Sequence, residues 1–247
     1  MQALERNGIR LAATVMLLRD AEHGLQVYMV KRPGRGAFPD LHVFPGGKVD
    51  EDDFAPDLTQ GLGDAAASAL LGIAAGGLRY WVAVARECFE ECGVLVVKGA
   101  DEHDLNQLQR LNAYRRDLLA GNISFSEICR REALTIDTDL LGYFSHWITP
   151  EAAPRRFDTR FFVAAMPAQQ VTLADTGETV EDAWISPAQA LQHAVDDTWQ
   201  MIDPTLRSLE TLQQFSSVAE VLQGVRRADH LMPLTDALAQ QGMQALR

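Results

Sequence analysis

The sequence predicts an α/β protein in which a mixed β-sheet lies between layers of helices. Apolar runs of strand length occur before, between and after segments with helical periodicity, and this order is typical of an α/β sandwich. The 247 residues are enough for one domain with insertions, and we expect a single domain over residues 1–247. Within it we expect a helical insertion at about 101–135 and a helical C-terminal segment at about 187–247.

The charge balance of the chain is acidic, with 22 basic and 34 acidic residues and a net charge of −12. A nucleic-acid-binding surface needs a basic face, so this balance argues against a nucleic-acid partner. No apolar run approaches the roughly 18 residues of a membrane helix, and the N-terminus lacks the pattern of a secretion signal. The three cysteines have neither disulfide nor zinc-site spacing. We therefore expect a cytoplasmic protein without a membrane partner.

The first predicted elements are two strands, over residues 11–19 and 25–32, joined as a hairpin. The loop that follows, 33–40, is rich in glycine and proline, and Arg32 and Arg35 lie at its start. Arginine donates paired hydrogen bonds to phosphate, so both residues are candidates for substrate binding. The alternative is a connecting loop whose charges are solvated.

A helix is predicted over 78–92, because apolar residues recur there at helical spacing and Gly93 can end it. Glu87, Glu90 and Glu91 are related by i, i+3 and i+4 steps and fall on the face opposite the apolar stripe. Like charges at this spacing cost roughly 0.2–0.5 kcal/mol, and a hard divalent cation would relieve that repulsion. The alternative is a solvated acidic face.

The run of residues 86–94, RECFEECGV, is similar to the second half of the Nudix box, R-E-U-x-E-E-x-G-U, where U is apolar. Gly46-Gly47 followed by Asp50 and Asp53 resembles its first half, G-x5-E. The sequence departs from the family in two ways: Asp53 stands in place of glutamate, and residues 54–85 separate it from Arg86 where the family has seven residues. The resemblance implies a Nudix hydrolase with the Nudix α/β/α sandwich fold.

The resemblance also implies a Mg²⁺ or Mn²⁺ site held by Glu87, Glu90, Glu91 and the Gly46 carbonyl oxygen. Arg86 would orient the glutamates. The shorter side chain of Asp53 argues against its being a metal ligand, and the sequence leaves its role and that of Asp50 open.

The acid that takes the proton from water is implied by the same resemblance. Nudix enzymes often use a loop acid that precedes a strand like Trp184-Ile185, and Glu178 occupies a similar place. Glu181 is the second choice, and a box glutamate such as Glu90 is a further alternative. Either loop acid could instead be simply solvated.

The resemblance implies an insertion at about 54–77 within the box, and this insertion and the one at about 101–135 are both predicted to be helical. Residues 64–75 are alanine-rich and are expected to form a short helix that ends at Gly76-Gly77. This helix could be a lid over the site, a dimer contact, or packing with no role in the chemistry. Residues 94–97 are strand-like. Residues 101–134 form two helices, the second begun by the capping box at Ser124. The first carries a stripe of Leu105, Leu108, Leu111, Leu118 and Leu119, and its acids and arginines are expected on solvated faces.

Two more strands are predicted over 140–149 and 156–166, with helices at 188–195, 204–215 and 217–226. Arg156 and Arg160 begin the second strand and are candidates for binding substrate phosphates. A surface ion pair is the alternative for each of them.

Beyond the box, the segments KRP at 31–33, VFPGG at 43–47, HWITP at 146–150 and RFDTRFF at 156–162 resemble the peroxisomal coenzyme A diphosphatase branch. That branch cleaves coenzyme A and acyl-CoAs to 3′,5′-ADP and (acyl-)phosphopantetheine. The chain departs from the bacterial coenzyme A signature, since Gly36 and Asp40 occupy its fixed positions, and the tail 245–247 is no peroxisomal address.

The resemblance therefore implies a small-molecule nucleoside-diphosphate substrate. The alternatives are a Nudix pyrophosphatase for ADP-ribose, NADH or a nucleotide sugar, and a non-catalytic Nudix fold that senses a ligand. The chain could also form a homodimer.

Overall fold

The computed structural model describes residues 4–34, 40–101, 104–153, 155–175 and 179–227 of the chain. The strands are β1 (Glu5–Arg6), β2 (Ile9–Ala21), β3 (Gly24–Lys31), β4 (His42–Val43), β5 (Gly46–Lys48), β6 (Thr59–Gln60), β7 (Ile136–Asp137), β8 (Leu141–Ile148), β9 (Phe157–Ala165) and β10 (Glu181–Ile185). The α-helices are α1 (Asp64–Leu70), α2 (Leu78–Cys92), α3 (Leu105–Leu119), α4 (Phe125–Arg131), α5 (Pro187–Val195), α6 (Asp203–Leu212) and α7 (Val218–Arg227).

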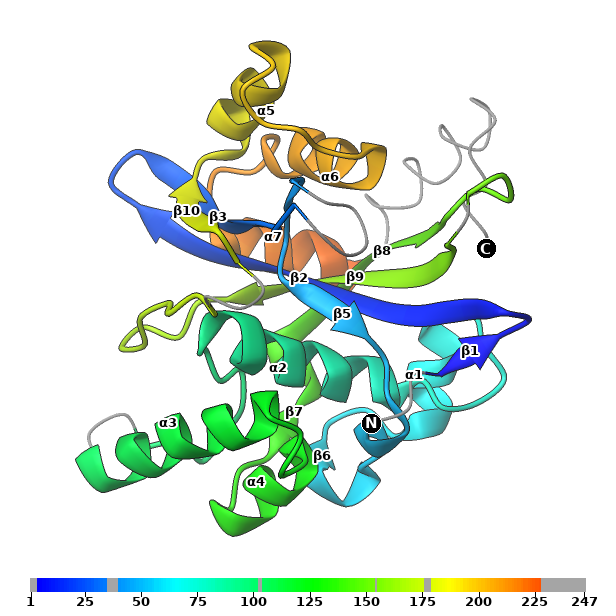
Figure 1. Ribbon diagram of the computed structural model, residues 1–247, viewed down its shortest axis with the longest axis vertical. Helices are drawn as coiled ribbons and strands as arrows, with labels where there is room; N and C mark the ends of the chain where they lie inside the picture. Colours follow the sequence, from blue (N-terminus) through cyan, green and yellow to red (C-terminus); the bar gives the residue numbers. More distant parts are fainter. Residues whose placement is uncertain (1–3, 35–39, 102–103, 154, 176–178, 228–247) are drawn as a thin grey trace.

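The main sheet has the strand order β10-β3-β2-β9-β8, with β1 and β5 also paired to β2 and β4 paired to β3. Strands β2 and β9 run parallel and the other neighbours run antiparallel, so the sheet is mixed. Helices α5, α6 and α7 lie on one side of it, and α1, α2, α3 and α4 lie on the other (Figure 1). The predicted α/β sandwich is confirmed.

Strand β9 shows how the sheet sorts side chains between its two faces, because successive residues of a strand point to opposite sides. Phe162 packs on Trp81 of α2, with ring centroids 4.9 Å apart. Its neighbour Phe161 belongs to the apolar cluster beneath α5, α6 and α7. Odd-numbered residues of this part of β9 therefore face α6, and even-numbered residues face α2.

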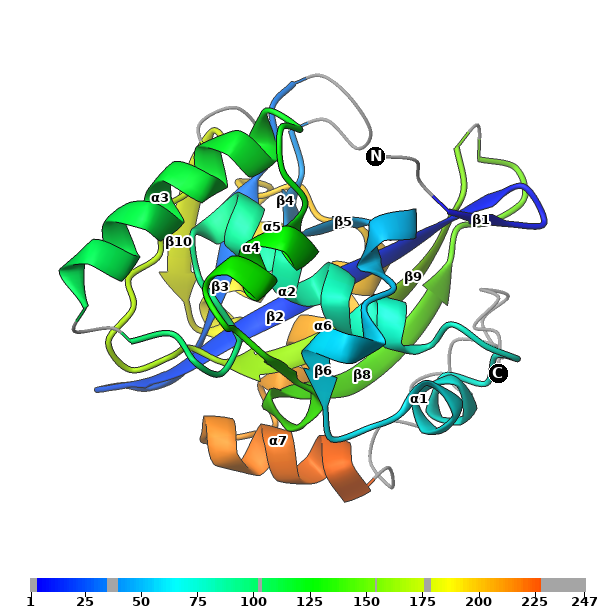
Figure 2. The ribbon, with the colours of Figure 1, turned by 90° about the horizontal axis from the view of Figure 1, so that it is seen from below.

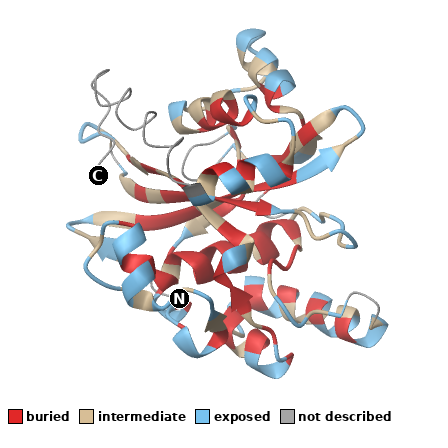
Figure 3. Ribbon diagram, turned by 180° about the vertical axis from the view of Figure 1, so that it is seen from behind, coloured by how far each residue is buried: buried red, intermediate tan, exposed pale blue. Residues whose placement is uncertain are grey.

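Helix α2 is the most enclosed element, since every residue except Arg79 and Glu90 is buried (Figure 3). One side packs against the sheet through Trp81, whose full burial contributes roughly 1.5–3 kcal/mol or more. The other side packs against the helical insertion, where Phe89 meets Phe125 of α4. The alternative of a solvated acidic face is therefore wrong for Glu87, which is buried against Gly47 of β5 and Arg86.

The two insertions pack on each other over α2 (Figure 2). Strand β6 of the first pairs in parallel with β7, which follows the second. The Ser126 hydroxyl of α4 donates to the carbonyl of Asp52 at 3.1 Å. Two details differ from expectation: α1 ends at Leu70, before Gly72 with its φ of 66°, and residues 94–97 form no strand.

The predicted leucine stripe of α3 is only partly correct. Leu105 is 72% exposed and Leu119 is 44% exposed. The buried positions are Gln107, Leu111, Arg115 and Leu118. No helix in the described part of the chain is long and apolar enough to cross a membrane.

Candidate functional site

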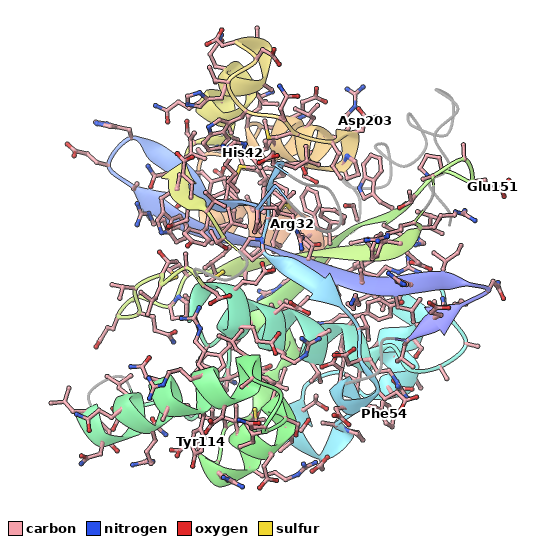
Figure 4. All side chains as sticks on the ribbon, viewed as in Figure 1. Arg32, His42, Phe54, Tyr114, Glu151 and Asp203 are labelled. Atoms are coloured by element: carbon pink, nitrogen blue, oxygen red, sulfur yellow. The ribbon has the colours of Figure 1, made fainter. Side chains whose placement is uncertain are left out.

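A cavity of about 930 Å³ lies where the acidic side of α2 meets the sheet and the start of α6. Its acidic end is lined by Asp50, Glu87, Glu90 and Glu91. Its apolar wall includes Phe44, Trp147, Phe157, Phe161, Met201 and Ile202. Two further lining residues, Arg32 and Asp203, are labelled in Figure 4 and mark its part between the sheet and α6.

The glycine turn reaches the acids of α2 because it has no side chains. Strand β5 pairs with β2, which places Gly46 opposite Thr14. The Gly46 amide donates to Glu91 Oε2 at 2.9 Å. A Cβ on Gly47 would lie 2.5 Å from Glu87 Oε1, so only glycine fits there without displacing that carboxylate.

Arg86 is the centre of the polar contacts at the acidic end, and its five N–H donors are all used. Nε and Nη2 bind the two carboxylate oxygens of Asp53 at 2.9 and 3.0 Å. Nη1 donates to Glu87 and to Glu90, each at 2.8 Å. The remaining Nη2 hydrogen bond goes to the Lys48 carbonyl at 2.7 Å. A single cation thus faces three carboxylates, so the cluster keeps an excess of negative charge.

Burial of this cluster shifts its titration. Burial raises the pKa of the Glu87 carboxyl well above its ordinary value; Arg86 lowers it, and the Glu90 and Glu91 charges raise it further. Burial likewise raises the pKa of Asp53, and the paired Arg86 guanidinium offsets part of that effect. A cation placed at this end would reverse the penalty on ionised Glu87.

The donor set fits a hard divalent cation. Carboxylate and carbonyl oxygens are the ligands that Mg²⁺ and Mn²⁺ prefer. As the side chains stand, no three of the described His, Cys, Asp and Glu residues are grouped to chelate an ion. Glu87 and Glu90 turn toward Arg86, and Glu91 toward the Gly46 amide, so ion binding requires these carboxylates to rotate.

The predicted substrate arginines are not all brought to the cavity. Arg32 lines it. Arg160 is 3% exposed on the α2 face of β9, with its Nε 3.7 Å from Asp158. Arg156 donates its Nε to the Thr149 carbonyl at 3.0 Å and does not line the cavity. Neither arginine forms the surface ion pair that was the alternative: Arg160 is buried beside Asp158, and Arg156 binds a backbone carbonyl.

Of the remaining predicted site residues, Arg35 and Glu178 lie outside the part of the chain that the structure describes. Glu181 is exposed on β10, opposite Lys31 in the register of the strand pair. Asp53 is the partner of Arg86 rather than a lining residue.

Residues 201–205 form a wall of the cavity that was not predicted from the sequence. Met201 and Ile202 precede the first turn of α6 and face the sheet across the cavity, but no chemical motif marks them. Phe157 and Phe161 also line the cavity and were not predicted. They share one face of β9 with Thr159, because every second residue of a strand points to the same side, and this alternation could have grouped them.

Comparison with known proteins gives a consistent result. A family model described as the NUDT19 Nudix domain matches residues 73–212, more than half of the chain. The acyl-coenzyme A diphosphatase NUDT19 of Xenopus laevis is 24% identical over 234 residues, covering 79% of this chain and 62% of the relative. The human protein of that name is 25% identical over 236 residues, covering 80% and 63%. The chain thus spans less than two-thirds of the length of these curated relatives.

A solved structure shows the same fold. The crystal structure of a Nudix hydrolase from Alicyclobacillus acidocaldarius superposes with a TM-score of 0.67 at 24% identity, covering 87% of this chain and 96% of that one.

Proposed function

The chain belongs to the NUDT19 family of Nudix domains, and from this we propose that it hydrolyses the diphosphate of coenzyme A or acyl-coenzyme A. The products would be 3′,5′-ADP and phosphopantetheine or its acyl derivative. The family makes the chain a Nudix hydrolase; the substrate and the metal are our proposal.

The observation that supports this proposal is the pairing of an acidic end with an apolar wall in one cavity. A diphosphate with divalent cations suits the Glu87, Glu90 and Glu91 end. Phe161, Met201 and Ile202 offer a surface that excludes water and suits a thioester or hydrocarbon chain. A substrate that carries both chemistries would occupy the whole volume.

The residues at the acidic end take the following roles in this proposal. Glu87, Glu90, Glu91 and the Gly46 carbonyl would hold Mg²⁺ or Mn²⁺. When bound, the ion would neutralise phosphate charge and acidify a water molecule. Arg86, whose Nη1 lies 2.8 Å from both Glu87 and Glu90, would orient these carboxylates.

Two further roles concern the substrate and the proton. Arg32 lines the cavity and would donate to a phosphate oxygen, with Arg35 as a second candidate. The proton from water would go to Glu178 or to Glu90. Glu90 lines the cavity and, with Arg79, is one of the two residues of α2 that are not buried, so its carboxylate is the better placed of the described candidates.

The test is product analysis with purified protein. Coenzyme A, acyl-CoAs, ADP-ribose and NADH are each incubated with Mg²⁺ or Mn²⁺, and 3′,5′-ADP is measured by chromatography. We expect 3′,5′-ADP from coenzyme A substrates. Cleavage of ADP-ribose with coenzyme A left intact would instead assign a different nucleoside-diphosphate conjugate.

Two variants sharpen this test. Glu90→Gln should abolish turnover with the fold intact, whereas Glu51→Gln, an exposed acid outside the cavity, should keep it. Met201→Thr should raise KM for acyl-CoAs more than for free coenzyme A, because it places a polar group in the apolar wall. Met201→Leu, which keeps that wall apolar, is its control.

A further inference from the structure

The C-terminal end of α2 is held by two segments that are distant in sequence. The last carbonyls of a helix have no partner within it and must find one elsewhere. The Glu91 carbonyl accepts from the Asp175 amide at 2.9 Å, and the Cys92 carbonyl accepts from the Leu173 amide at 2.7 Å. Both amides belong to the stretch between β9 and β10.

The Glu90 carbonyl is taken by a side chain from the helical insertion. Arg115 of α3 donates to it through Nε at 3.1 Å and Nη2 at 2.8 Å. Nη2 also donates to the Leu173 carbonyl at 2.7 Å. One guanidinium therefore joins α3, the end of α2 and the 173–175 segment at a single point.

Three features show that this contact is built into the fold. Arg115 is only 7% exposed, and it lies on the buried side of α3 between Leu111 and Leu118. Its positive charge sits at the negative end of the α2 dipole, where cations are favoured. Gly93 leaves the space it needs, because a Cβ there would lie 3.0 Å from Arg115 Nη1.

We propose that Arg115 is a positioning residue for the metal-binding glutamates of α2. It touches neither the cavity nor, by this inference, the substrate. It fixes the backbone of Glu90 itself, and through Leu173 it holds the segment whose Asp175 amide fixes the backbone of Glu91. The helical insertion at 101–135 would thus contribute to catalysis through the last turn of α2.

The inference rests on the proposed function in taking Glu90 and Glu91 as metal ligands. A measurement of Mn²⁺ binding without substrate separates the two. Isothermal titration with Mn²⁺ reports the site directly, and the product assay reports the substrate. If the wild-type protein binds Mn²⁺ and cleaves no coenzyme A, the substrate proposal fails while this inference stands; if it binds no Mn²⁺, both fail.

Arg115→Gln is the principal variant, and Arg110→Gln is its matched control. Arg110 lies on the same helix and forms a two-point pair with Glu132, at 2.7 and 2.8 Å, within the insertion. We expect Arg115→Gln to raise the Mn²⁺ dissociation constant about tenfold, as for other residues that orient metal ligands. Its kcat should fall while KM for substrate stays unchanged, because the cavity walls are untouched.

Arg110→Gln should loosen the insertion and leave Mn²⁺ affinity and kcat unchanged. A purely structural role of Arg115 predicts that both variants lower the melting temperature and neither changes Mn²⁺ affinity; that result overturns the inference. Should Arg115→Gln fail to fold, Arg115→Met carries the same test. Methionine keeps an apolar stem but has no N–H donor for the Glu90 and Leu173 carbonyls, so unchanged Mn²⁺ affinity in the methionine variant also overturns the inference.

Discussion

Asp53 and Arg86 form a buried two-point ion pair although 33 positions separate them in the sequence. Their side chains are 2% and 4% exposed, and the two hydrogen bonds are 2.9 and 3.0 Å long. The Asp50 amide also donates to Asp53 Oδ2, at 2.8 Å. The pair fixes both ends of the long insertion, so the cavity keeps its acidic end despite the residues between them.

Asp53→Asn should therefore affect both stability and activity. Arg86 keeps its hydrogen bonds to Glu87 and Glu90 in this variant, so the expected cost is that of a lost hydrogen bond between charged groups, about 1.5–3 kcal/mol. For a chain of this size that lowers the melting temperature by roughly 3–12 °C at about 2–4 °C per kcal/mol. Arg86 would then draw Glu87 and Glu90 more strongly, and we expect the rate of hydrolysis to fall. Asp52→Asn, an exposed neighbour, is the control, and equal stability of the two variants would contradict the prediction.

The ionised Glu87 carboxylate should destabilise the metal-free protein. Because burial raises its folded pKa, its favourable contribution is present below its unfolded pKa of about 4.3 and is lost as pH rises through the folded value. In metal-free protein, Glu87→Gln should become more stable relative to the wild type between pH 4 and pH 8. Thermal melts in EDTA measure this difference. A difference that does not change with pH is the contrary result.

The same variant should respond differently to metal. Added Mn²⁺ stabilises a protein that binds it in the folded state, so the wild-type melting temperature should rise with Mn²⁺ concentration. Glu87→Gln should show little or no such rise. An equal rise in both would mean that Glu87 is not a ligand.

Gly47→Ala should impair the acidic end without unfolding the protein. The added Cβ would lie 2.5 Å from Glu87 Oε1, and the carboxylate must turn away to make room. We expect activity to fall at least tenfold, as when residues that orient metal ligands are changed. Gly63→Ala is the matched control, because a Cβ there meets no atom within 4 Å. Equal activity of the two variants would show that the turn tolerates a side chain.

The sequence predicted helix α2 with its observed bounds, Leu78–Cys92. It also predicted the ends of the long strands β2, β3, β8 and β9 to within two residues. These elements have strong periodicity, and Gly93, with a φ of 69°, marks the end of α2. Burial of Glu87 could not be predicted in the same way. It depends on β5, whose Gly47 lies against the Glu87 carboxylate only in the folded chain.

The spacing of Arg115 and Arg160 along their elements indicates which face each lies on, but their roles were predicted wrongly. Arg115 lies four residues after Leu111 and three before Leu118, on the buried stripe, yet an arginine there was assigned to solvent. Arg160 alternates with Phe161, and only the position of α6 decides which of those two sides holds the cavity. In both cases a tertiary contact, rather than local spacing, determines the role of the side chain.

Asp158 provides a pH test away from the cavity. Its carboxylate forms a 2.7 Å hydrogen bond with His146 Nε2. The side chains of Arg160 and Arg6 lie 3.7 and 4.0 Å from the same carboxylate. Burial alone would raise the pKa of Asp158, but the His146 hydrogen bond and the two arginine charges leave it below its ordinary value. The stability it contributes is therefore present above its unfolded pKa of about 3.9 and is lost as pH falls through the lower folded value.

Asp158→Asn should consequently destabilise the protein by about 1.5–3 kcal/mol at pH 7, the range for a hydrogen bond to a charged group. Because the wild-type carboxyl becomes protonated in acid, the difference in unfolding free energy should shrink as pH approaches 3. Urea unfolding at several pH values measures it, with the exposed Asp117→Asn as control. If the difference in unfolding free energy is the same at pH 3 and pH 7, the prediction is wrong. The negative charge of Asp158 would then contribute nothing to stability, and the substitution would act only through the changed packing and hydrogen bonding of the side chain.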